Sequence, residues 1–500
     1  MLSNILLGLE TALTPLALVY CFLGVFFGTL VGVIPGIGPL TAISMLLPLT
    51  YHLDPTTSLI MLAGIWYGTG YGGSTAAILV NIPGTTSSAI SCLDGHPMAL
   101  QGRGAEALLM TSVASFVGGI IGIVLLMIFA PTIARYALSF GSAEYFSLMV
   151  LGLVAASAVS DGSVAKALAM VVLGVVCGTV GIDLYTGDER LTFGVLDLSN
   201  GIGLVPLAMG VFGIAEVVSN AQSGARRNFD RKSVSLRTMK LPREEVKRSI
   251  MPMLRGSGIG SFFGALPGTG PSVASFFAYA LEKRLSTSPE RFGKGAVEGV
   301  TAPEAANNAA DQTAFVPTLT LGIPGSATMA LMLGALTIHG IAPGPKLLSD
   351  QPQLFWGLIM SFWIGNLMLL VLNIPMIGLW VRLLLVPSRF LYPAILMFIA
   401  IGTLSLHNNT FDVWLVIAFG LIGIVMRWLD FPAAPLLLGF VLGPMMEEHF
   451  RRAMLLSRGD PATFIERPIS AVVLGLALLM LVWGIWSHHK NRRLAPAAIS

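Results

Sequence analysis

A short polar stretch in the second half of the chain carries residues that could do chemistry in an otherwise apolar sequence. Residues 303–313 include Glu304, Asn307, Asn308 and Asp311, and the apolar run 315–321 follows directly. Carboxylate and amide oxygens can bind Na⁺ or relay a proton, and ionisable residues inside a membrane are functional candidates by default. The alternative is a loop with a helix N-cap. We predict that these four residues bind or move an ion.

The composition defines the surroundings of these carboxylates. Of the 500 residues, 54% are hydrophobic and 11% are charged, whereas soluble globular proteins carry about 25% charged residues. Long apolar runs at 113–130, 164–180, 358–381 and 469–486 indicate membrane-spanning helices rather than barrel strands. We therefore predict an all-α polytopic membrane protein. The histidines and cysteines show no metal-binding spacing, so we expect no metal or cofactor beyond a coupling Na⁺ or H⁺.

Two phrases rich in glycine and proline occupy corresponding places in the two halves of the chain. A stripe of glycines at every fourth position comes first in each: Gly24, Gly28 and Gly32, and then Gly256, Gly260 and Gly264. Such stripes let helices pack closely. Each stripe leads into two prolines and two glycines within five residues, 35–39 and 267–271. No helix continues through such a sequence, because proline removes a donor and glycine relaxes the backbone.

A second pair of breaks follows at residues 81–85 and 322–326. Non-helical backbone at membrane depth survives only where protein buries it or where it lines a watery cavity. The arms 40–49 and 272–281 are too short to span a membrane, so they resemble re-entrant or half-helices, whose N-termini suit an anionic carboxylate. Turns between ordinary helices at the membrane surface are the alternative. The predicted substrate-binding residues are Pro35, Gly36, Gly38, Pro39, Thr41, Asn81, Pro83, Gly84, Thr85, Pro267, Gly268, Gly270, Pro271, Ser272, Pro324, Gly325 and Ser326.

The order of these markers predicts an internal duplication. A third pair, 206–210 and 435–439, follows the two pairs of breaks in the same order. We predict a two-fold repeat with broken or re-entrant helices and roughly a dozen helical elements. The segments are a first membrane repeat at 1–219, a basic cytoplasmic loop at 220–249, a second repeat at 250–446, and a loop, extra span and basic tail at 447–500. The basic tail favours inverted over parallel repeats.

Other functional classes fit the sequence less well. The glycines of residues 68–73 formally match a dinucleotide-binding pattern, but no acidic residue follows at the required distance. The basic loop is better explained by membrane topology than by nucleic-acid binding. An intramembrane enzyme acting on lipid or peptide is the main alternative, but we find no convincing catalytic group. A structural scaffold gives no reason for duplicated breaks.

Several of these motifs resemble the large membrane subunit of tripartite tricarboxylate transporters. The resemblance rests on residues 24–42, 71–75, 81–84, 303–308 and 321–326. It implies a bacterial inner-membrane permease, surrounded by lipid, that works with a small four-helix membrane subunit and a periplasmic solute-binding protein. It also implies ion-driven import of carboxylates such as citrate, with selectivity resting largely on the binding protein. The sequence contains no Walker phosphate-binding motif, which agrees with secondary transport.

Overall fold

The computed structural model describes residues 2–34, 36–159, 163–183, 185–222, 239, 242–384, 386 and 388–494. These residues are overwhelmingly helical, and their strands form one antiparallel pair, β1 (Gly181–Ile182) and β2 (Glu189–Arg190). Six described helical stretches are long and apolar enough to cross a membrane, and five shorter apolar helices accompany them. The predicted all-α polytopic membrane fold is confirmed.

The first half of the chain, before residue 223, contains the helices α1 (Leu2–Ala12), α2 (Pro15–Val33), α3 (Pro39–Thr50), α4 (Pro55–Val80), α5 (Ser91–Met98), η1 (Ala99–Arg103), α6 (Gly104–Ala137), α7 (Ser142–Val159), α8 (Val164–Gly178), η2 (Leu196–Asn200), α9 (Leu204–Ala208), η3 (Met209–Ile214) and α10 (Ala215–Gln222). Residues 204–221 form one continuous candidate span. The predicted basic loop falls largely on residues 223–238, 240 and 241, which lie outside the described residues.

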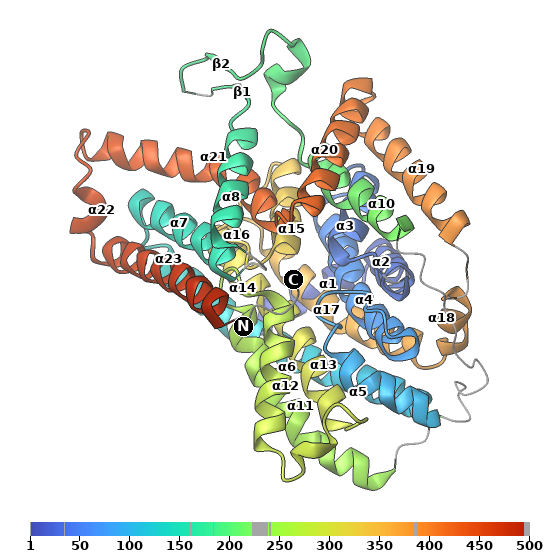
Figure 1. Ribbon diagram of the computed structural model, residues 1–500. Coiled ribbons are helices and arrows are strands. Elements are labelled where there is room, and N and C mark those ends of the chain that lie inside the picture. Colours follow the sequence, from blue (N-terminus) through green and yellow to red (C-terminus); the bar gives the residue numbers. More distant parts are fainter. Residues whose placement is uncertain are drawn as a thin grey trace.

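The second half contains the helices α11 (Arg243–Gly264), α12 (Gly270–Leu285), η5 (Pro289–Arg291), α13 (Glu298–Thr313), α14 (Phe315–Leu321), α15 (Ala327–Ile338), α16 (Leu347–Asp350), α17 (Pro352–Asn373), α18 (Ile377–Leu383), α19 (Ser388–His407), α20 (Thr410–Trp428), α21 (Ala433–Leu456), α22 (Thr463–Glu466) and α23 (Pro468–Leu494). Figure 1 shows α7, α21, α22 and α23 together on one side, and α19 and α20 on the other. The strand pair projects beyond the helices.

The two glycine stripes make the same kind of contact in the two halves. A Cβ atom added to Gly24, Gly28 or Gly32 of α2 would lie 2.3, 2.3 or 2.5 Å from a backbone oxygen of α4. Added to Gly256, Gly260 or Gly264 of α11, it would lie 2.2, 2.0 or 2.3 Å from a backbone oxygen of α13. The absence of a side chain is what permits these helix backbones to touch. Each stripe therefore fixes the helix that leads into the first break of its half.

Substitution along α11 tests this packing. We expect Gly260→Val to lower the free energy of unfolding by more than about 3 kcal/mol, because a side chain there would collide with the Ala306 carbonyl of α13 and the backbone cannot give way locally. Gly258→Val is the matched control, since nothing lies within 4 Å of a Cβ added there. Thermal unfolding of the purified variants would measure the difference. Equal loss of stability in both would show that α11 and α13 are not held by close backbone contact.

Candidate functional site

The first break of each half holds a glycine in the left-handed conformation. Gly36 has a φ of +81° and Gly268 a φ of +83°, a region that side chains strain. The Gly36 carbonyl accepts a hydrogen bond from Asn220 Nδ2 at 2.7 Å, and the Gly268 N–H donates to the Gly325 carbonyl at 2.9 Å. The backbone freed by each break is therefore partly satisfied by protein groups. Pro35 lies outside the described residues.

The second break of each half begins at a helix cap in the left-handed conformation. The glycine of this break lies close to the last glycine of the stripe in the same half. Asn81 ends α4 with a φ of 55°, and Gly322 ends α14 with a φ of 70°. A Cβ on Gly84 would lie 2.1 Å from the Gly32 carbonyl oxygen, and one on Gly325 would lie 3.5 Å from that of Gly264. The two breaks of each half thus lie beside one another.

A hydrogen bond between hydroxyls joins the breaks of the two halves. Thr86 Oγ1 and Ser272 Oγ are 2.7 Å apart, so the second break of the first half meets the start of α12. Thr86 is exposed and Ser272 is half-buried. The structure therefore places one predicted residue, Ser272, at a junction of both halves on the protein surface, next to a threonine that the sequence analysis did not select.

The other predicted hydroxyls are engaged within the protein. Thr41 is buried and donates to the Phe212 carbonyl at 3.1 Å. Thr85 bonds the hydroxyls of Ser87 and Ser88, both at 3.1 Å. Ser326 caps α15 by accepting the Met329 N–H at 3.3 Å. Gly38 and Pro39 begin α3, while Gly270 and Pro271 begin α12. Pro83 and Pro324 precede the second-break glycines.

The four predicted ion-binding residues lie on α13, which is buried along its length, and Glu304 has the most extensive set of partners. Its Oε1 accepts hydrogen bonds from Ser74 Oγ, at 2.7 Å, and from Ser91 Oγ. Its Oε2 accepts from Ser115 Oγ at 3.4 Å and from Asn307 Nδ2 at 3.3 Å. The serines belong to α4, α5 and α6, so the first half of the chain encloses a carboxylate of the second half.

Asp311 and its neighbour Gln312 present oxygens that lack partners. Both residues are buried, and Asp311 Oδ1 and Gln312 Oε1 have no hydrogen-bond partner among the described residues. The Tyr67 hydroxyl on α4 is likewise buried and unpartnered there. Buried polar atoms are nearly always hydrogen-bonded, so each exception calls for a strain, catalytic, water or ion explanation. Asn308 instead donates to the Glu304 carbonyl at 3.0 Å.

A second buried carboxylate, Asp94 of α5, ties the halves together near the end of α12. Its Oδ1 accepts three backbone N–H bonds from Gly293, Gly295 and Ala296 at 2.8–2.9 Å, and its Oδ2 accepts the Tyr279 hydroxyl at 2.9 Å. A side chain at Gly299 would come within 2.2 Å of Oδ2. All the donors are fixed groups of this protein, so Asp94 has a structural role.

Sequence reasoning selected the polar face of α13 but missed its partners. Ser74, Ser91 and Ser115 belong to three separate helices, and nothing in their spacing shows that they converge. The glycine-rich stretch around Gly70 carried a signal, because a Cβ added there would lie 3.7 Å from Asp311 Oδ2. This part of α4 therefore lies directly beside the carboxylate of Asp311. Two hollows on the surface of the described residues, of about 600 and 360 Å³, are lined by other residues.

Comparison with known proteins identifies the family. Residues 18–438 match the family model described as the tripartite tricarboxylate transporter TctA family. The chain belongs to this family. It is a transporter and not an enzyme, and tripartite systems imply partner subunits.

Two relatives from Agrobacterium vitis are themselves uncharacterized. One, described as a 52.8 kDa protein in the TAR-I ttuC′ 3′ region, is 51% identical over 99% of this chain and 98% of its own length. The other, in the TAR-II ttuC′ 3′ region, is 53% identical over 47% of this chain and 97% of its own length. No solved structure matches.

The structural role of Asp94 in this TctA-family protein can be tested by removing first one of its hydrogen bonds and then all of them. Tyr279→Phe removes one donor and should cost about 1 kcal/mol of unfolding free energy, the usual net value of a hydrogen bond. Asp94→Ala leaves the buried N–H groups of Gly295 and Ala296 and the Tyr279 hydroxyl without their partner, and it should cost about 3 kcal/mol or more. Denaturation of the two purified variants under identical conditions would compare them. A loss for Asp94→Ala no greater than for Tyr279→Phe would contradict the structural role.

Proposed function

We propose that this protein is the large permease subunit of a binding-protein-dependent secondary transporter of the bacterial inner membrane. It imports tricarboxylates or related organic acids and is driven by an ion gradient. Its partners are a small four-helix membrane subunit and a periplasmic solute-binding protein. The observation that carries the proposal is the family match over residues 18–438, in a chain whose paired helix breaks lie side by side.

The proposed substrate site lies at the junction of the breaks, around Ser272. Its donors are the N-terminal backbone N–H groups of α12 and hydroxyls such as those of Ser272 and Thr86, whose 2.7 Å bond lies on the protein surface. Helix N-termini favour carboxylates. Each neutral hydrogen bond contributes only about 0.5–1.5 kcal/mol net. A site built from such donors binds weakly, which leaves high-affinity capture to the separate solute-binding protein.

The proposed coupling site is the buried face of α13. Glu304 is enclosed by hydroxyls of the first half, and Asp311 offers a buried oxygen without a partner among the described residues. Asn307 and Asn308 complete the polar face and hold the side chain and carbonyl of Glu304. Na⁺ or a proton is the ion in this proposal, because both suit oxygen ligands of this kind.

We also propose that the two halves are inverted repeats. The matched contacts of the two glycine stripes support a duplication. The third pair of markers supports inversion. Residues 204–222 run from the strand pair toward the basic loop, whereas α21 runs toward the strand pair, where Glu447 contacts Arg190 at 3.0 Å. Corresponding segments that run in opposite directions are the signature of inverted repeats.

Uptake into vesicles tests the proposed function. Proteoliposomes containing this protein and its small subunit, supplied with loaded solute-binding protein, should accumulate citrate or a related carboxylate only when an ion gradient is imposed. The same vesicles without the solute-binding protein are the control. Hydrolysis of a lipid or peptide by the purified protein, without any ion-dependent uptake, would instead support the intramembrane enzyme.

Substitution of Asp311 tests the coupling site. Asp311→Asn keeps the volume and removes the charge, so we expect ion-driven uptake to fall at least tenfold while the amount of protein in the membrane is unchanged. Glu290→Gln is the control, because it removes a carboxylate that is exposed. Uptake would be measured at several ion concentrations. If rate and ion dependence are both unchanged in Asp311→Asn, this carboxylate plays no part in coupling.

A further inference from the structure

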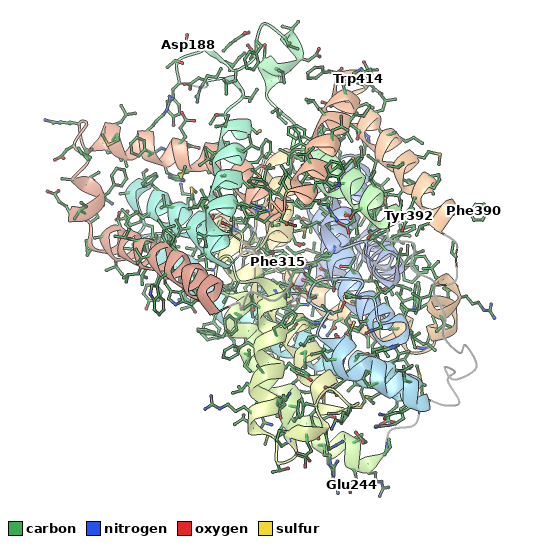
Figure 2. The ribbon with its side chains drawn as sticks, viewed as in Figure 1. Asp188, Glu244, Phe315, Phe390, Tyr392 and Trp414 are labelled. Carbon is green, nitrogen blue, oxygen red and sulfur yellow. The ribbon has the colours of Figure 1, made fainter. Side chains whose placement is uncertain are left out.

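Residues 181–203, here called the hairpin segment, form an unusual excursion between two apolar helices. The segment contains β1, β2 and η2, and it connects α8 to α9. Figure 2 shows Asp188 of this segment at one edge of the molecule and Glu244 of α11 at the opposite edge. Phe193 and Leu196 are 85% and 83% exposed. Leu191 and Phe193 both have positive φ values, 53° and 51°, a conformation that is rare for bulky residues.

The hairpin segment lies on the face opposite the basic loop. One candidate span, residues 204–221, separates the two. The neighbouring helix α20 runs in the same direction as residues 204–221. Asn409 at its start donates to Asp197 Oδ1 of the hairpin segment at 2.8 Å, and Arg427 at its end pairs with Glu216 of α10. Trp414 and Trp428 are exposed near the two ends of α20, as in aromatic belts. Since the positive-inside rule places the basic loop in the cytoplasm, the hairpin segment faces the outside.

A closed ring of charges fixes the hairpin segment to α21. Arg190 contacts Asp183 at 2.7 Å and Glu447 at 3.0 Å, while Arg451 contacts the same two carboxylates at 3.0 and 2.7 Å. The hydrogen bond from the Tyr185 N–H, with the two arginines beside it, lowers the pKa of Asp183 from its ordinary value. Asp183 therefore keeps its charge, and its contacts with both arginines, to a lower pH than an ordinary aspartate would. A surface held in one conformation loses little entropy when a partner binds.

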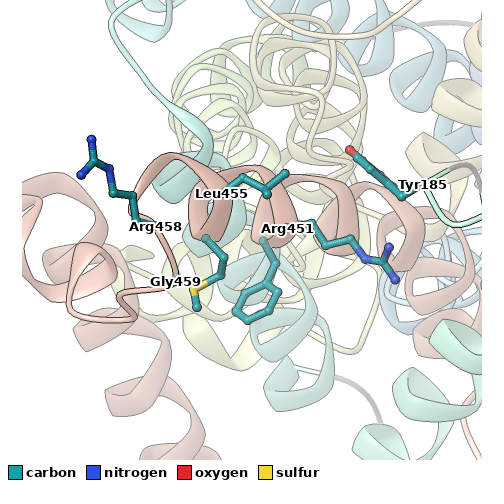
Figure 3. A pocket seen from close by; sticks show the side chains of 7 residues that line it. Tyr185, Arg451, Leu455, Arg458 and Gly459 are labelled. Atoms are coloured by element: carbon teal, nitrogen blue, oxygen red, sulfur yellow. The ribbon is translucent and has the colours of Figure 1, made fainter.

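A groove continues this surface along α21. Its volume is about 600 Å³, and it is lined by Tyr185 of the hairpin segment and by residues of α21 and the loop that follows it, Phe450, Arg451, Met454, Leu455, Arg458 and Gly459. Figure 3 shows Tyr185 and Arg451 at one end of the groove and Arg458 at the other. Arg451 lies 5.3 Å from the centre of the Tyr185 ring. Apolar side chains edged by charges are typical of protein interfaces.

We propose that the hairpin segment and this groove form the docking surface for the soluble, solute-loaded binding protein. This inference rests on the proposed function, which requires such a partner on the outer face. The residues Asp188, Glu189 and Asp197 are exposed on the same segment as the exposed apolar residues Phe193 and Leu196. At the hairpin segment these carboxylates disfavour anionic lipid, whereas a soluble protein with basic groups opposite them, and with an acidic group opposite Arg458 of the groove, complements the surface.

The end of the hairpin segment also contacts α15, a helix that follows one of the breaks. Leu204, directly after it, packs so tightly on α15 that a Cβ at Gly334 would lie 2.0 Å from Leu204 Cδ2. Helix α15 begins at Ser326, in the second break. Leu204 therefore provides a direct contact between the end of the hairpin segment and a helix that starts at the second break.

Titration of the binding protein tests the docking surface. Proteoliposomes with the permease and its small subunit would be supplied with increasing concentrations of carboxylate-loaded solute-binding protein. We expect the double variant Phe193→Asp/Leu196→Asp to raise the concentration giving half-maximal uptake at least tenfold, with the rate at saturation retained. Leu100→Asp is the matched control: it is 76% exposed and near Arg103, which pairs with Glu245 of α11 at 3.0 Å, on the basic-loop face.

The outcomes separate this inference from the proposed function. An unchanged half-maximal concentration in the double variant would overturn the docking surface and leave the transporter intact. No uptake by the unaltered permease at any concentration of binding protein would overturn the proposed function itself. A photo-crosslinking amino acid at position 193 gives a test that does not depend on the double variant folding. Crosslinks to the binding protein would support the inference, and crosslinks only to lipid or to a second copy of the chain would contradict it.

Discussion

A carboxylate buried among membrane helices must find hydrogen-bond donors inside the protein, and this constraint shapes the centre of the molecule. Glu304 meets it with three serine hydroxyls from the first half of the chain and one asparagine amide from its own helix. Removing such donors leaves a buried polar group without hydrogen-bond partners, which is costly in a protein interior. The hydrogen bonds to Glu304 therefore help to hold α4, α5 and α6 in place around α13.

The glycine stripes make this arrangement possible. Because α2 and α11 carry no side chains at the contact, α4 and α13 can approach them backbone to backbone. Helices α2 and α11 then end in breaks whose freed backbone groups bond other protein groups: the Gly268 N–H donates to the Gly325 carbonyl, and the Gly36 carbonyl accepts from Asn220. Close packing and broken helices thus act together, and they bring polar backbone and hydroxyls to the junction between the halves.

The membrane fold, the glycine stripes and the helix breaks could be predicted from the sequence. The side-chain contacts around Glu304 could not, because they depend on tertiary packing. The breaks and stripes were predictable because proline and glycine act locally on the backbone, and the low charge content indicated a membrane protein. The serine cage around Glu304 was not predictable, since Ser74, Ser91 and Ser115 become neighbours only through tertiary packing. Thr41 illustrates the same limit: its place at the start of α3 suggested a ligand contact, whereas its hydroxyl bonds a carbonyl of η3.

Measurement of ion flux tests the central claim, that the enclosed carboxylate of Glu304 links ion movement to substrate movement. Proteoliposomes containing the complete transporter would be assayed for carboxylate uptake together with Na⁺ and proton entry, for the unaltered protein and for Glu304→Gln. Glutamine keeps one oxygen that can accept from Ser74 and Ser91, its amide nitrogen replaces the oxygen that accepts from Ser115 and Asn307, and it carries no charge. We predict that ion entry accompanies uptake in the unaltered protein, and that the variant loses ion-driven accumulation but still equilibrates carboxylate across the membrane. Unchanged ion flux per carboxylate in Glu304→Gln would contradict the account.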